Sequence, residues 1–134
     1  MILIDTSGFL AAADSRDAAH SEMLAAFGRL GRGTFGAAVT TSYVLVESLT
    51  LIRRRLGLEK AQAFERVTRD TAGIRIVWVD AELHQAAAGM MFSHPDKDWS
   101  IVDCSCFVTM GQLGIRQALT LDRDFDQAGF TRVP

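Results

Sequence analysis

Short apolar runs alternate with longer stretches of helical periodicity along the chain. Residues 2–4 are three consecutive aliphatic side chains, a run too short for a buried helix and typical of a central strand covered on both faces. Strands are predicted at residues 2–4, 37–40, 75–79 and 117–121, with 130–133 as an edge strand. Helices are predicted at residues 9–13, 20–30, 42–56, 58–71, 81–92 and 100–113, with a single turn at 124–128. The alternation predicts an α/β fold with three layers, α/β/α, around a mainly parallel sheet of four to five strands.

Two of the predicted strands stop at a carboxylate. The run at 2–4 ends at Asp5, and the run that closes with Leu121 is followed by Asp122. Right-handed crossovers bring the carboxyl ends of parallel strands to one edge of the sheet, so both acids should lie at that edge. The alternative for Asp5 is that it only caps the next helix.

Two further acids lie where predicted helices begin at the same edge. Asp103 stands three residues after Ser100, which is the spacing of a capping box, and that role alone would explain it. Glu47 lies almost opposite the predicted core stripe of its helix, so its default position is on a solvated face. That stripe consists of Leu45, Leu49, Ile52 and Leu56.

The four acids, if they converge, need a compensating charge. Two like charges 4 Å apart cost about 4 kcal/mol at an effective dielectric constant near 20. Protons, basic side chains or a cation could supply it, but the two lysines, Lys60 and Lys97, are not adjacent to these acids. Oxygen ligands suit Mg²⁺ or Mn²⁺, and such ions activate water in phosphodiester cleavage.

Composition limits the alternatives. The 134 residues are enough for one domain, and the net charge of −2 gives no global basic field for nucleic acid. Cys104 and Cys106 lack metal or redox spacing and are expected to be buried free thiols, which suits a reducing cytoplasm. The sequence shows no signal peptide and no apolar stretch long enough for a membrane span, so a cytoplasmic location is expected.

Four motifs in order resemble a known family. They are Ile2-Leu3-Ile4-Asp5-Thr6-Ser7, Thr41-Ser42-Tyr43-Val44-Leu45-Val46-Glu47, Trp99-Ser100-Ile101-Val102-Asp103-Cys104 and Leu119-Thr120-Leu121-Asp122-Arg123-Asp124-Phe125. The set resembles PIN-domain ribonucleases, in particular VapC-type toxins of bacterial or archaeal toxin–antitoxin pairs, over nearly the whole chain. The resemblance implies one PIN-like domain over residues 1–134.

Site roles follow from the resemblance, motif by motif. Asp5 and Asp103 correspond to the principal metal ligands, and Glu47 either binds the metal or orients the attacking water. Asp122 completes the acidic site, and the expected cofactor is Mg²⁺ or Mn²⁺.

Other residues have supporting or open roles. Thr6 and Thr120, beside the acids, are expected to donate hydroxyl hydrogen bonds to ligands or water. Asp98 also lies near the third motif, but Asp103 is preferred because it lies inside the helix that follows Ser100. Asp124 is expected in a supporting position at best.

The resemblance also implies an activity and partners. It implies cleavage of single-stranded or structured RNA by metal-activated water, with 3′-hydroxyl and 5′-phosphate products. It implies homodimerisation and inhibition by a cognate antitoxin protein, with no membrane partner.

Three other functions are alternatives to that one. A haloacid-dehalogenase-like phosphatase also opens with a strand that ends in Asp, but it needs a second Asp where Ser7 stands, and a late Lys. A housekeeping PIN nuclease in RNA maturation and a non-catalytic PIN scaffold that binds RNA or protein remain open.

Two features outside the acids have two interpretations each. Arg53, Arg54 and Arg55 either complement the carboxyl end of their helix or contact an RNA backbone or an acidic antitoxin segment. Trp99 either packs over the start of the following helix, against Cys104, or stacks on a base.

Overall fold

A five-stranded parallel sheet forms the centre of the molecule. The computed structural model describes all 134 residues. The strands are β1 (Ile2–Ile4), β2 (Ala38–Thr41), β3 (Ile74–Val77), β4 (Gln117–Leu119) and β5 (Thr131–Val133). Their order across the sheet is β3-β2-β1-β4-β5, and every neighbouring pair is parallel. The predicted parallel sheet is confirmed, and its edge strand at the end of the chain is present.

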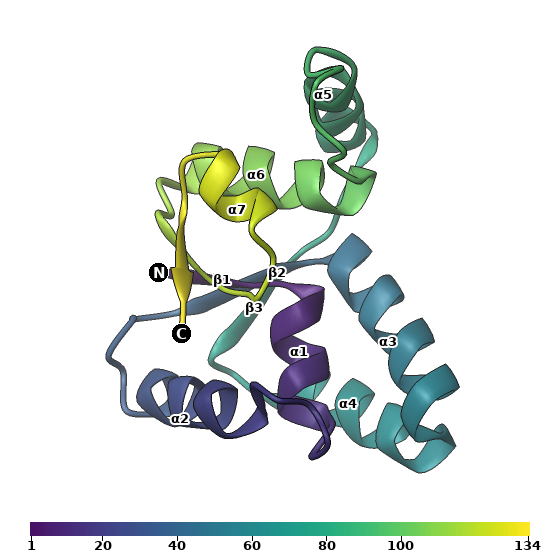
Figure 1. Cartoon of the computed structure of the whole chain (residues 1–134), viewed down its shortest axis with the longest axis vertical. Helices are drawn as coiled ribbons and strands as arrows, with labels where there is room; N and C mark the ends of the chain where they lie inside the picture. The colour runs from purple at the N-terminus through teal and green to yellow at the C-terminus, as the bar shows by residue number, and fades with distance from the viewer.

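Helices cover both faces of this sheet. They are α1 (Thr6–Ala13), α2 (His20–Gly31), α3 (Ser42–Leu56), α4 (Leu58–Asp70), α5 (Ala81–Phe92), α6 (Ile101–Leu113) and α7 (Asp124–Gln127). Helices α1 to α4 lie on one side of the sheet and α6 and α7 on the other, while α5 packs against α6 and extends outward (Figure 1). The predicted three-layer α/β/α architecture is therefore confirmed. No helix combines the length and the apolar character that crossing a bilayer requires.

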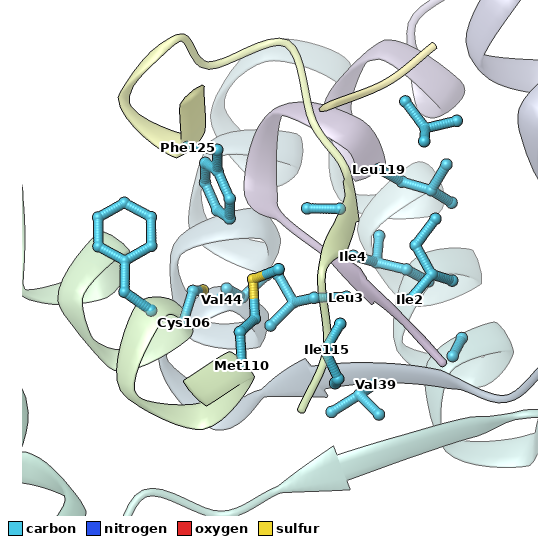
Figure 2. Close-up of a cluster of buried hydrophobic side chains, with 14 of the residues drawn as sticks. Ile2, Leu3, Ile4, Val39, Val44, Cys106, Met110, Ile115, Leu119 and Phe125 are labelled. Atoms are coloured by element: carbon cyan, nitrogen blue, oxygen red, sulfur yellow. The ribbon is translucent and has the colours of Figure 1, made fainter. Parts of the chain in front are cut away.

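The core lies on both faces of β1. Ile2, Leu3 and Ile4 have no exposed surface, which explains why this strand is apolar at every position. Figure 2 shows Leu3 directed toward Met110 of α6, whereas Ile2 and Ile4 lie on the opposite side of the strand. Each large aliphatic side chain buried in this way contributes about 1.5–3 kcal/mol. The strand that ends in Asp5 is thus firmly anchored.

Helix α3 differs from its predicted packing. Its buried line is Val44, Ser48 and Ile52, whereas Leu45 and Leu49 are only half-buried. The reason is that α3 packs on α1 and on α4 at once, so its deepest positions lie between those contacts. The predicted stripe was therefore wrong except at Ile52, and the shift turns Glu47 away from the solvated face.

The strand and helix ends at the carboxyl edge also differ from prediction. Helix α1 begins at Thr6 rather than at residue 9, because the Asp5 side chain accepts a hydrogen bond from the Ser7 N–H and caps it. Strand β4 ends at Leu119 rather than at residue 121, because hydroxyl groups and not a neighbouring strand bind the N–H groups of Leu121 and Asp122.

Gly8 allows α1 to lie directly on β4. A Cβ atom at this position would come within 2.3 Å of the Leu119 carbonyl oxygen, a backbone atom that cannot rotate away. The absence of a side chain therefore sets the distance between the first turn of α1 and the end of β4.

The cysteines and Trp99 belong to the core. Cys104 and Cys106 are buried and free, as predicted, and burial raises the pKa of the Cys104 thiol to about 11. Only 7% of Trp99 is exposed, and its ring packs edge-on against Phe107 and lies beside His94. Trp99 is therefore a packing residue, and its burial leaves no free face for a base.

Candidate active site

Asp5 lies at the centre of the carboxyl edge of the sheet. It is only 4% exposed, and its Oδ2 atom accepts hydrogen bonds from the Ser7 hydroxyl and the Thr120 hydroxyl, both at 3.0 Å. The Ser7 N–H approaches the same oxygen at 3.3 Å. Both hydroxyl groups bind Oδ2, so Oδ1 is left without a hydroxyl partner.

The same two hydroxyl groups fix the segment after β4. The Ser7 oxygen accepts a hydrogen bond from the Leu121 N–H at 2.9 Å, and the Thr120 oxygen accepts one from the Asp122 N–H at 3.0 Å. Residues more than 110 positions apart in the chain are thus joined directly. The position of Asp122 relative to Asp5 is set by this network.

A hydrogen bond to the first residue of α1 connects Glu47 to the site. Its Oε2 atom accepts a hydrogen bond of 2.7 Å from the Thr6 hydroxyl, and its side chain is half-buried. Thr6 follows Asp5 directly, so this bond ties the second turn of α3 to the end of β1. Helical periodicity alone favours a solvated face for Glu47, whereas its place near the start of α3 predicts the carboxyl edge; the bond to Thr6 agrees with the second prediction.

Asp103 occupies the first turn of α6 in a complete capping box. Its Oδ2 atom accepts from the Ser100 N–H at 2.8 Å, while the Ser100 hydroxyl accepts from the Asp103 N–H at 3.0 Å. One carboxylate oxygen from each of Asp103, Asp122 and Asp124 lies within 4.8 Å of the others. The Asp103 side chain therefore caps α6 and also belongs to an acidic cluster.

Burial and nearby negative charges raise the pKa values of the acids at this edge. Burial raises the pKa of Asp5, against the opposing effect of its hydrogen bonds. Burial also raises the pKa of Asp103 to about 6, and the negative charges of Asp5 and Asp122 add to the effect. Burial and the charges of Asp122 and Asp98 raise the pKa of Asp124. The charge of Asp103 is thus repelled by those of Asp5 and Asp122.

No basic side chain forms an ion pair with these acids, although the charge of Lys97 partly opposes the rise in the pKa of Asp124. Four ion pairs occur in the protein: Arg16–Asp14, Arg69–Asp70, Lys97–Asp96 and Arg132–Asp126. None includes Asp5, Glu47, Asp103, Asp122 or Asp124. The predicted crowding of acids without guanidinium partners is therefore present.

Two residues have a different place from the one predicted. Asp124 belongs to the three-carboxylate group, whereas the sequence left it in a supporting position. Ser7 was considered only as a position lacking a second Asp, yet its hydroxyl contacts Asp5, Thr120 and the Leu121 N–H. The available signal was its position two residues after Asp5, where Ser can bond back to a capping carboxylate. Asp98 is exposed in the loop before α6, outside the cluster.

The fold and the site together define a class. The acids of this parallel α/β domain lie beside the carboxyl end of β1. The strand order reverses at β1, because the chain continues to β2 on one side of it and returns to β4 on the other. Ligands of open α/β sheets bind at such a point, beyond the carboxyl ends of the strands. The protein is therefore an α/β domain with an acidic site at the switch point of its sheet.

Comparison with known proteins identifies the family. Residues 2–131 match the model of the PIN domain, and the chain belongs to this family. It is 33% identical over 133 residues to the 23S rRNA-specific endonuclease VapC20 of Mycobacterium tuberculosis, in strains CDC 1551 and H37Rv, which covers 99% of this chain and 98% of the relative.

Solved structures agree with this assignment. The crystal structure of M. tuberculosis VapC20, described as a sarcin–ricin loop cleaving toxin, superposes with a TM-score of 0.87 at 31% identity, over 98% of this chain and 97% of that chain. FitAcB from Neisseria gonorrhoeae has a TM-score of 0.67 at 17% identity, over 100% of this chain and 97% of that chain, and shares the fold.

Proposed function

We propose that this protein is a metal-dependent endoribonuclease and the toxin of a toxin–antitoxin pair, with ribosomal RNA as its substrate. The observation that carries this proposal is the group of unpaired carboxylates from Asp103, Asp122 and Asp124 beside the buried Asp5. Similarity over nearly the full length to a 23S rRNA-specific endonuclease supports the choice of substrate. We infer that residues 1–134 form a single PIN-like domain.

The donor set fits a hard divalent cation. All candidate ligands are carboxylate oxygens, three of them within 4.8 Å of one another, and none forms an ion pair with a basic side chain. We assign Asp5, Asp103 and Asp122 as ligands, with Asp124 beside them and Glu47 as a ligand or a group that orients water. Bound Mg²⁺ or Mn²⁺ would supply an activated water and stabilise charge on the phosphate.

The chain's own residues hold this arrangement in advance. Ser7 and Thr120 bind one oxygen of Asp5 and leave the other without a hydroxyl partner. Thr6 fixes Glu47 through the 2.7 Å hydrogen bond. Such supporting hydrogen bonds orient ligands, and removal of one typically costs 10- to 100-fold in metal affinity or activity, on the order found for outer-shell partners.

The proposal is tested by cleavage of a sarcin–ricin loop RNA by purified protein, with Mn²⁺ or with a chelator. Asp5→Asn should lower cleavage by more than about 100-fold, beyond the range for supporting partners. Asp17→Asn is the matched control, because Asp17 also caps a backbone N–H, that of Ala19, but outside the acidic site. Metal-independent cleavage, or full activity of Asp5→Asn, would contradict the mechanism.

We infer that the antitoxin binds a groove away from the acids. A cavity of about 710 Å³ lies between α2 and α4 with Phe9 of α1 beneath it. Most of its lining is apolar, including Phe27 and Phe64, and Lys60 lies at its side. A groove of this kind accepts the apolar face of an amphipathic helix. Phe27→Asp should therefore abolish co-purification with the product of an adjacent small gene, while RNA cleavage by the free protein continues.

The same proposal extends to assembly and location. A homodimer in the cytoplasm is expected, and light scattering of the purified protein tests the dimer. A housekeeping nuclease would differ in having no antitoxin gene beside its own and no growth arrest on expression.

A further inference from the structure

The indole side chain of Trp78 is largely exposed to solvent. It is 72% exposed, whereas the other tryptophan, Trp99, is 7% exposed. Trp78 follows the last residue of β3 directly, at the carboxyl end of the edge strand. A side chain of this size gains little stability for the fold when it remains in water, so its position calls for another explanation.

The backbone that carries Trp78 is held in place. The N–H of Val79 donates a hydrogen bond of 2.9 Å to the Ser42 hydroxyl at the start of α3. The next residue of α3, Tyr43, bonds His84 of α5 through its hydroxyl at 2.6 Å, and the two rings meet edge to face at 5.9 Å. Trp78 is thus presented by a fixed segment between α3 and α5.

This segment lies at the same edge of the sheet as the acids. Val77 pairs with Thr41 in the sheet register, and the register of β1 with β2 places Asp5 at the same level. Strand β3 is two strands from β1, which corresponds to about 10 Å across the sheet. Trp78 projects one residue beyond this level, on the side where the strands end.

Helix α3 links the two regions directly. Tyr43 precedes Glu47 by four residues, so both lie on one face of the helix. Glu47 is bonded to Thr6 at the acidic site, and Tyr43 is bonded to His84 beside the Trp78 segment. An RNA strand that passes from the acids along the start of α3 would therefore meet Trp78.

We propose that Trp78 stacks on an unpaired base of the RNA next to the phosphodiester that is cleaved. The inference rests on the proposed ribonuclease function and adds a residue that selects unpaired substrate. The Tyr43 hydroxyl and the His84 ring beside the segment are polar and can form hydrogen bonds with a nucleotide. Sequence-specific recognition of RNA relies on unstacked bases that pack against aromatic side chains.

Binding is measured by indole fluorescence, with a single-stranded oligoribonucleotide as the probe and EDTA present to prevent cleavage. Stacking should quench Trp78, while the buried Trp99 provides the residual signal. Trp78→Ala should remove the quenching and weaken binding about 5- to 100-fold. Trp78→Phe should restore most of the affinity without the quenching. Leu58→Ala, a 57% exposed apolar residue on α4, is the control and should bind as the parent does.

Cleavage kinetics with Mn²⁺ complete the test. Trp78→Ala should raise KM by a similar factor and leave kcat within about twofold, because Trp78 does not touch the reacting atoms. Unchanged KM and affinity in an active Trp78→Ala variant would overturn the inference alone. Conversion of a dimer to a monomer by Trp78→Ala, with RNA affinity unchanged, would also overturn it and assign Trp78 to a protein contact. Absence of cleavage by the parent protein would instead count against the proposed function.

Discussion

Acids at the carboxyl edge of the sheet and acids elsewhere on the surface differ in whether a basic side chain pairs with them. Asp14 and Asp126 each pair with an arginine, at 3.0 and 2.7 Å. The hydrogen bond from Arg16 lowers the pKa of Asp14. At the sheet edge, burial raises the pKa of Asp5 and of Asp103, and no basic side chain approaches either one.

The two groups of acids also differ in their effect on the stability of the fold. Exposed ion pairs contribute about 0–1 kcal/mol and serve mainly to match local charges. Unpaired carboxylates that repel one another reduce stability unless a ligand neutralises them. The acidic cluster at the carboxyl edge is where we propose that a positively charged ligand binds.

The largest effect is expected from Gly8→Ala. The new Cβ would meet the Leu119 carbonyl oxygen, so α1 must move away from β4 and carry Ser7 from Thr120. The free energy of unfolding should fall by about 3 kcal/mol, the upper part of the range for overpacking, and RNA cleavage should fall with it. Urea unfolding measures the first effect.

Gly111→Ala is the matched control for that prediction. Gly111 lies within α6, is exposed, and has open space where the Cβ would be built. Its substitution should raise stability by up to about 1 kcal/mol through helix propensity. Equal behaviour of the two variants would mean that the approach of α1 to β4 is not restrictive.

The next effect concerns bound metal. Mn²⁺ at about 100 times its dissociation constant should raise the free energy of unfolding by about 2.7 kcal/mol through mass action. Asp103→Asn should greatly reduce this gain, whereas Asp126→Asn, at a paired surface acid, should leave it intact. Thermal unfolding across a Mn²⁺ titration provides the measurement, and a loss of similar size in both variants would refute a specific site.

A smaller effect of opposite sign is expected without metal. Asp5→Asn removes a buried charge and its repulsion with Asp103, so the metal-free protein should be as stable as the parent or about 1 kcal/mol more stable. Asp126→Asn should lose up to about 1 kcal/mol, because it breaks an ion pair. Denaturant unfolding in EDTA compares them, and a clear loss of stability in Asp5→Asn would show a structural role.

A further effect is expected on the pH dependence of stability. The pKa of Asp103 is about 6 in the folded protein and near 3.8 when unfolded, so the folded state binds more protons between these values. Stability of the metal-free protein should therefore be greatest below pH 4 for this group and decline as pH rises toward 6. Mn²⁺ should abolish the decline, since it replaces the proton. Unfolding curves at several pH values, with and without metal, measure the change.

Some features of the site were predictable because their causes are local. The strand at 2–4, the capping box of Ser100 and Asp103, and the placement of Asp5 and Asp122 at one edge depend on neighbouring residues and on the handedness of parallel crossovers. The buried face of α3 was less predictable, because contacts with both α1 and α4 decide which of its residues are buried.

The sequence by itself determined an alternating α/β fold with carboxylates after two strands, since apolar periodicity and strand-end residues are local properties. Only the tertiary structure decided which groups meet. Thr6 bonds Glu47 across 41 positions, and Thr120 bonds Asp5 across 115. It also brought Asp124 into the acidic cluster and made Ser7 a contact of Asp5. Hydrogen bonds depend on distances of a few tenths of an ångström, and such distances are fixed only when the helices and the sheet have packed together.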